Sequence, residues 1–324
     1  MSNNDLIKKA ISKYPGNAYL YFGNVNRYGY SKLSSILESR NGKKDKACLI
    51  LITYGGNPDA AYRIARALRH HYKTFEILIA DLCKSAGTLI CIGADRLIFG
   101  DRGELGPLDV QISKPDELFE NMSGLALTQA LDSLQASILS SFREYLIDIR
   151  GNGGLKTRLA AELATKLAAS FVSPIAARID PLTLGEHERA IQIGYSYGER
   201  LNEMACSLKP GSLKRLVGDY PSHSFVIDRK EASDIFHQVV KPDETTKYLY
   251  LWARMIVEDY KDDDNKPIIV DLEKKLVNND YNNETSSPEK TNSGHTADNS
   301  ANRESRKNRS DNTGPKQNRT KSTY

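Results

Sequence analysis

The chain has 324 residues, 40% of them hydrophobic and 27% charged, and a formal net charge of +4. It is long enough to bury a sizeable core in one or two domains, and so small a positive charge does not by itself indicate a nucleic-acid-binding protein. No apolar run approaches the ~18 residues of a membrane span, and the N-terminus lacks the basic-then-apolar order of a secretory signal. We therefore expect a soluble, cytoplasmic protein without membrane contact.

Two strand-like runs early in the chain each end at small residues and continue into a helix. Residues 47–53 end at Tyr54-Gly55-Gly56, where Asn57 is suited to cap a helix that begins at Pro58. Residues 75–80 end near Ser85, and a helix is predicted from there to about residue 94. A third run, residues 96–99, closes at a turn. Strands separated by helices favour parallel pairing, so we predict an α/β fold with helices layered on a sheet.

The second half reads as helix. Apolar residues recur at helical spacing over 127–149, and Leu159, Leu163 and Leu167 mark a further helix. Another helix is predicted over 185–208. Asp228 and Glu231 form a capping box before a helix at 230–239, and Asp243 is suited to cap the last one. We interpret these apolar stripes as core or subunit-contact faces.

Composition divides the chain into three parts. Residues 1–44 are treated as an N-terminal segment, 45–260 as the folded domain, and 261–324 as a polar tail too poor in large apolar residues to fold. The tail ends in a basic stretch, residues 303–321, which is either a solvating segment or a weak contact for nucleic acid or an acidic partner. Four cysteines without C-x-x-C spacing predict buried free thiols, and six histidines without ligand spacing predict no metal site.

Ser85 is the strongest candidate for chemistry. A serine at a strand-to-helix junction can project its hydroxyl from the edge of the sheet, although capping the helix is the alternative role. Gly55-Gly56 allows positive φ and close backbone approach, or serves simply as a tight connection. Together the turns could place a nucleophile beside the amides of Gly56 and Ala86, which are the minimum components of an acyl-transfer site.

Three motifs in this order resemble the Clp/crotonase superfamily: Thr53-Tyr54-Gly55-Gly56, Lys84-Ser85-Ala86-Gly87-Thr88 and Gly103-Glu104-Leu105-Gly106-Pro107-Leu108-Asp109. Within it the chain is most similar to signal-peptide-peptidase-A-like serine peptidases, in the group labelled serine dehydrogenase proteinases. The resemblance covers about residues 45–112, and 155–240 more loosely.

The resemblance implies a ββα spiral fold, a homo-oligomer, and hydrolysis of peptide bonds without a cofactor. It makes Ser85 the nucleophile and the amides of Gly56 and Ala86 the oxyanion hole. Substrate contacts would come from the residues around these turns: Tyr54, Gly55, Pro107 and Asp109. An extended peptide is expected to add as a strand beside Gly55-Gly56.

The general base stays open. Clp-type peptidases carry a histidine where this chain has Gly106-Pro107-Leu108, and no histidine occurs between His71 and His187. Peptidases of the signal-peptide-peptidase-A type use a lysine instead, for which Lys114, Lys156 and Lys166 lie downstream. His223 is the other candidate, with Asp109 or Asp219 to orient it.

Two other functions fit the same residues. A non-catalytic scaffold or adaptor would keep the fold without the base, and the absent Clp histidine favours it. An acyl-CoA enzyme of the crotonase branch would use the same amides on a thioester, but only Glu104 lies near to supply the carboxylate that such enzymes usually need.

Overall fold

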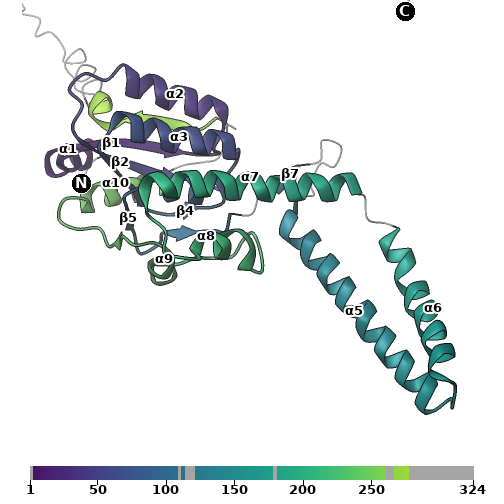
Figure 1. Ribbon diagram of the computed structural model, residues 1–324. Coiled ribbons are helices and arrows are strands. Elements are labelled where there is room, and N and C mark those ends of the chain that lie inside the picture. Colours follow the sequence, from purple (N-terminus) through teal and green to yellow (C-terminus); the bar gives the residue numbers. More distant parts are fainter. Residues whose placement is uncertain (1–2, 109–110, 114–120, 178–180, 260–265, 277–324) are drawn as a thin grey trace, which may run out of the picture. The chain divides into compact units, whose positions relative to one another are not determined.

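The computed structural model describes residues 3–108, 111–113, 121–177, 181–259 and 266–276 (Figure 1). All of them belong to one compact unit, Met1–Glu284. The predicted disordered tail lies outside the described residues from position 277 onward.

A six-stranded sheet with the order β10-β1-β2-β3-β5-β9 forms the centre of the described part of the chain. Four neighbouring pairs are parallel, and only β10 runs antiparallel, against β1. The α/β class and the parallel pairing are therefore confirmed. The strands are β1 Asn17–Phe22, β2 Lys46–Ile52, β3 Thr74–Ile79, β5 Arg96–Phe99, β9 Val239–Val240 and β10 Ile268–Asp271.

Helices cover both faces of this sheet, which explains why its central strands are apolar at successive positions. One face packs against α2 Arg27–Glu38, α3 Pro58–His71 and α4 Ala86–Ile92. The other packs against α1 Asn3–Lys13 and α10 Lys247–Asp259. Alternate residues of β2 go to the two layers: Leu49 and Leu51 to the first, Cys48 and Ile50 to the second.

The predicted caps are present. Asn57 Oδ1 accepts a hydrogen bond from the Ala60 amide at 2.8 Å, with Pro58 in the first turn of α3. Asp228 Oδ1 accepts from the Glu231 amide at 2.8 Å and begins α9 Arg229–Ile235. That helix ends earlier than predicted, because the residues after it become β9 and pair with β5.

The predicted divisions at residues 44 and 261 do not match the structure. Residues 1–44 hold α1, β1 and α2, which share the sheet and its two cores with the residues that follow. Residues 266–276 hold β10 and a final helical turn, and β10 pairs with β1 from Tyr19–Asp271 to Phe22–Ile268. The composition of 261–324 is polar, but its short apolar run is stabilised by a partner strand distant in sequence.

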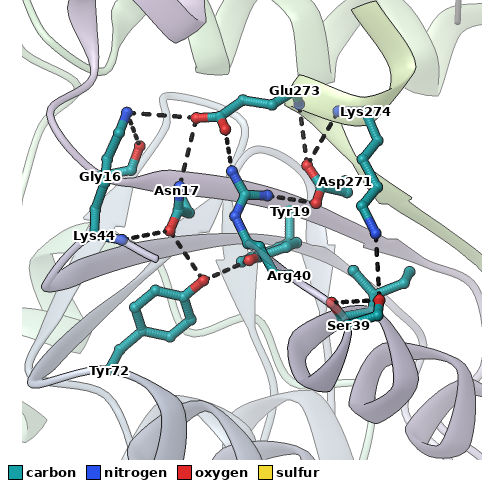
Figure 2. A network of polar contacts seen from close by, with 11 residues as sticks. Gly16, Asn17, Tyr19, Ser39, Arg40, Lys44, Tyr72, Asp271, Glu273 and Lys274 are labelled. Atoms are coloured by element: carbon teal, nitrogen blue, oxygen red, sulfur yellow. Dashed lines mark hydrogen bonds and ion pairs between the residues drawn. The ribbon is translucent and has the colours of Figure 1, made fainter. Parts of the chain in front are cut away.

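A buried polar network holds β10 in place (Figure 2). Arg40, which follows α2, forms ion pairs with Asp271 and Glu273. Asn17 Oδ1 accepts from the Lys44 amide at 3.0 Å and from the Tyr72 hydroxyl at 3.1 Å. The network therefore ties the beginning of β1 to the C-terminal strand.

The helices of the second half are α5 Gly124–Gly151, α6 Thr157–Ala176 and α7 Pro181–Ala205, so the predicted helical half is confirmed. Of the two interpretations of the leucine stripe on α6, a core face does not match the structure, and a subunit-contact face stays a prediction. The buried residues of α6 are Ala160, Ala164, Ala168 and Val172, whereas Leu159, Leu163 and Leu167 are exposed. Small side chains on the inner face suit close packing against α5, so the larger ones point outward.

By length and composition alone, α6 also meets the requirement for a helix that crosses a membrane, the one such helix among the described residues. The expectation of no membrane contact is thus not supported by the structure.

Three of the four cysteines are buried as predicted, Cys48, Cys83 and Cys91, while Cys206 is exposed; all four are free thiols.

The remaining described elements are short: β4 Leu82–Cys83, β6 Glu104–Leu105, β7 Gln111–Ser113, β8 Asn121–Ser123, α8 Ser212–Lys214 and a π-helix at Arg215–Asp219. β4 pairs with β6 in a small second sheet that continues from the main one, next to Ser85.

Candidate active site

The turn after β2 is held by its own backbone and by the loop between β1 and α2. Thr53 Oγ1 accepts from the Gly55 amide at 3.0 Å, and the Val25 amide donates to Gly55 O at 2.7 Å. Gly55 and Gly56 have φ of +119° and +137°, which residues with a side chain rarely adopt. A Cβ at Gly56 would also lie 2.2 Å from Val25 O. Glycine is therefore required here.

The turn after β4 presents Ser85. Its φ of +50° and ψ of −112° are unusual for a residue other than glycine, and its side chain makes no capping hydrogen bond to α4. The helix-cap role considered from the sequence is thus not the one the structure shows. Strained backbone of this kind is common where a side chain has to be aimed for function.

The two turns are in contact. The Thr53 amide donates to Leu82 O at 2.8 Å, and the Lys84 amide donates to Thr53 O at 2.9 Å. A Cβ built on Gly55 would lie 2.8 Å from Ser85 Cβ and 3.3 Å from Ser85 Oγ. The Gly55 backbone therefore packs directly on the serine side chain, across about thirty residues of sequence.

Both candidate amides lie at this junction. Ala86 is the first residue of α4, so its N–H has no acceptor within the helix. Outside regular helices and strands, none of the backbone hydrogen bonds among the described residues uses the N–H of Gly56 or of Ala86. These two donors are available to an incoming group.

Lys84 is a site residue whose role the sequence did not reveal. It is buried, and its Nζ lies 3.2 Å from Glu104 Oε1, 3.3 Å from Leu105 O and 3.3 Å from Phe225 O. These are three partners for the three donors of an ammonium group. Lys84 thus fastens the Ser85 turn to β6 and to the 220–227 loop. The sequence feature that could have indicated this role is a lysine directly before the serine, at the end of an apolar run.

His223 lies on that same loop and is half-buried. Ile227 and Leu105 exchange backbone hydrogen bonds of 2.9 and 3.0 Å, and Phe225 O accepts from Lys84. The loop that carries His223 is therefore held against the residue that precedes Ser85.

The other predicted site residues are placed less favourably or are not described. Lys166 and Lys156 are exposed on and beside α6, which packs mainly on α5. Lys114 and Asp109 lie outside the described residues. Pro107 is buried, whereas Tyr54 is 70% exposed beside the glycine turn. The remaining candidate carboxylates differ: Asp219 is exposed, and Glu104 is paired with Lys84.

Within the described part of the chain, no group of three or more His, Cys, Asp or Glu side chains is arranged to hold a metal ion.

Residues 34–118 match the family model described as ClpP-like SDH-type serine proteinase. This stretch contains all three motifs, so the resemblance to Clp-like serine peptidases read from them is confirmed there. Two curated relatives from Methanocaldococcus jannaschii, the uncharacterized proteins MJ0137 and MJ1495, are 38% and 36% identical over 76 and 66 residues. These matches span 23% and 20% of this chain, and 27% and 23% of the relatives. The chain thus spans about a quarter of the length of the curated relatives it matches.

Solved structures similar to this chain include a serine-to-alanine mutant of the 1510-N membrane-bound stomatin-specific protease. It is 18% identical with a TM-score of 0.27, over 46% of this chain and 68% of that one. ClpP1 from Listeria monocytogenes is 12% identical with a TM-score of 0.27, over 50% and 82% of the two chains.

Proposed function

From the match of residues 34–118 to ClpP-like SDH-type serine proteinases, we propose that this protein is a serine peptidase with Ser85 as its nucleophile. One observation carries the proposal: the Gly55 backbone packs on the Ser85 side chain, whose backbone is held at positive φ without capping the helix. Ser85 Oγ attacks the carbonyl carbon of a peptide bond, and the amine half of the substrate leaves. Water then attacks the acyl-enzyme ester, releases the acid half and restores the hydroxyl.

The oxyanion of each tetrahedral intermediate is stabilised by the N–H groups of Gly56 and Ala86. Neither N–H donates to the backbone of the turns around it, so no existing backbone hydrogen bond has to be broken when the substrate binds. Donors fixed in advance stabilise charge that develops in the transition state.

His223 is the proposed base. It takes the proton from Ser85 Oγ and returns it to the leaving amine, as the His of a serine triad does. The loop at 220–227 is held by Phe225 against Lys84 and by Ile227 against Leu105, whereas Lys166 and Lys156 are exposed beside α6. Lys84 is a positioning residue, because its ammonium group contacts three acceptors that fix the Ser85 turn.

The proposed substrate is an extended peptide that lies beside the glycine turn. Tyr54 and Gly56 are exposed there and offer a ring face and backbone groups. Recognition through the peptide backbone makes few demands on sequence. The chemistry requires neither metal nor cofactor.

The direct test replaces the nucleophile. Ser85→Ala should lower the hydrolysis of a fluorescently labelled unfolded protein by about a thousandfold or more, and abolish labelling by a fluorophosphonate. Ser224→Ala, an exposed serine on the 220–227 loop, is the matched control and should keep both signals. Thermal unfolding should show that both variants are folded.

Two outcomes would reject the peptidase. A folded wild-type protein that neither hydrolyses protein nor takes up the fluorophosphonate would favour the scaffold. Protection of that protein against thermal unfolding by coenzyme A would favour the acyl-CoA enzyme instead.

The base is tested separately. His223→Ala should lower turnover by a hundredfold or more and change the shape of the pH–rate profile, because a general base acts only in its deprotonated form. His237→Ala, an exposed histidine, should leave the profile unchanged. Full activity in His223→Ala together with loss of activity in Lys166→Ala would transfer the role to the lysine.

We also propose that copies of the chain associate through α6, as the resemblance to oligomeric peptidases implies. Its exposed face carries Leu159, Leu163, Leu167, Phe171 and Ile175 at intervals of four residues. Contiguous apolar surface of this kind is typical of contact sites.

A further inference from the structure

A pocket of about 530 Å³ lies between α2, α3 and α7, lined by residues that take no part in the proposed active site. Its character comes from three tyrosines and three arginines. They are Tyr30, Tyr62, Tyr197, Arg63, Arg66 and Arg200.

The three arginines are exposed and lie over aromatic rings. Arg63 lies over the Tyr30 ring at 5.6 Å from its centroid, and Arg66 and Arg200 lie over the Tyr62 ring at 5.8 and 5.7 Å. No ion pair joins any of the three to a residue in the described part of the chain. Contact with a ring face orients a guanidinium group without using its N–H donors, which stay available to a ligand.

The tyrosines form a stacked platform beside these cations. The Tyr62 and Tyr197 rings stack with centroids 4.5 Å apart and planes inclined by 14°. The Tyr197 hydroxyl donates to Asp59 Oδ1 at 2.8 Å, which joins α7 to the first turn of α3. The platform therefore connects two helices that line the pocket.

The balance of charge in the pocket favours an anion. Its two carboxylates are Asp59, which accepts from Tyr197, and Glu38, which accepts from Ser34 Oγ at 2.9 Å. Against them stand the three arginines. Burial, followed by the nearby charge of Lys43, lowers the pKa of His71, as expected where positive charges crowd together.

We propose that this pocket binds a nucleoside phosphate, with the phosphate on Arg63, Arg66 and Arg200 and the base against the tyrosine rings. A planar guanidinium fork matches a phosphate in two-point hydrogen bonding, and aromatic side chains stack on nucleobases. The volume lies within the ~300–1,000 Å³ of small-molecule sites and exceeds what a lone phosphate would fill. Three arginines beside aromatic rings are the combination such a ligand needs.

Binding is measured with a fluorescent ribose-labelled ADP and the full chain, followed by competition with ADP, adenosine and inorganic phosphate. We expect saturable binding that ADP displaces at a concentration at least tenfold lower than adenosine or phosphate. Arg63→Ala, Arg66→Ala and Arg200→Ala should each weaken it tenfold or more, as should Tyr62→Leu. Arg66→Lys keeps the charge without the fork and should also weaken it.

Arg158→Ala is the matched control, because it removes an exposed arginine from α6 and should not change the affinity. The proposal is overturned if no saturable binding is seen, or if Arg158→Ala weakens binding as much as Arg66→Ala does. Equal displacement by adenosine or by phosphate alone also overturns it. Because hydrolytic activity is not the readout, failure here leaves the proposed peptidase unaffected.

Discussion

Two helices with similar apolar periodicity, α3 and α6, differ in where their large apolar side chains lie. On α3 the buried face includes Ile64 and Leu68, packed on the sheet. On α6 the buried residues are mostly alanines, and the leucines that mark the pattern face outward. Periodicity thus identifies that a helix has an apolar face, but the partner decides which side is covered. The sheet supplies that partner for α3, whereas the described chain leaves the larger side chains of α6 exposed.

The largest effect is expected for a buried ion pair beside the sheet, compared with an exposed ion pair on α6. Arg40→Ala should lower the free energy of unfolding by about 3–5 kcal/mol, because Asp271 stays buried without its cation. Arg158→Ala breaks the exposed pair with Glu162 on α6 and should change it by less than about 0.5 kcal/mol. Urea denaturation measures both. A similar loss of unfolding free energy in Arg40→Ala and Arg158→Ala would contradict this prediction.

The second-largest effect on the free energy of unfolding is expected at the glycine turn after β2. Gly55→Ala should lower the free energy of unfolding by about 2 kcal/mol, since alanine is strained at φ +119° and its Cβ would contact Ser85. Gly211→Ala is the control: its φ of +80° is also unfavourable, but open space surrounds it. A larger loss for Gly55→Ala, measured by urea denaturation, isolates the contact between the two turns. Equal losses of stability in the two variants would mean that backbone strain alone explains the effect of Gly55→Ala.

Asp243 before α10 gives a smaller, pH-dependent effect. Hydrogen bonds from Thr245 and then Thr246 lower the pKa of its carboxyl to about 2, against partial burial. Since this pKa is depressed in the folded state, the stabilisation is present above pH ~4 and is lost as the pH falls toward 2. Asp243→Ala should therefore cost about 1 kcal/mol at pH 7, and thermal unfolding should show the difference narrowing in acid. A difference that persists at pH 2 would contradict the assignment.

The smallest effect on stability is expected on the outer face of α6. Leu163→Gln with Leu167→Gln should change the free energy of unfolding by less than about 0.5 kcal/mol per site, because both leucines are already exposed. If α6 mediates association, the same variant should have a lower mass by light scattering. Ala164→Gln, on the buried face, should instead destabilise by about 1–3 kcal/mol through overpacking. An unchanged assembly in the double variant would exclude this face.

The predictions from the sequence were most accurate for features that turn, cap and strand residues determine. The cap at Asn57, the strands before the two turns, and the meeting of Gly55 with Ser85 follow from turn residues and from parallel pairing. The predictions from the sequence failed where contacts with residues distant in sequence determine the structure. β10 is a short apolar run in a polar segment and becomes a strand only because β1 accepts it. The role of Lys84 depends on three acceptors from β6 and the 220–227 loop, none of which is adjacent in sequence.

The pairing of Tyr19 with Asp271 also sets an order of events during translation. About 250 residues separate the two strands, so at ~5–20 residues per second roughly 10–50 s elapse before β10 leaves the ribosome. In that interval the outer edge of β1 has no permanent neighbour, and an unpaired edge invites pairing with other nascent chains. The emergence of β10, and not the synthesis of the Ser85 turn, is thus the step at which the sheet can close.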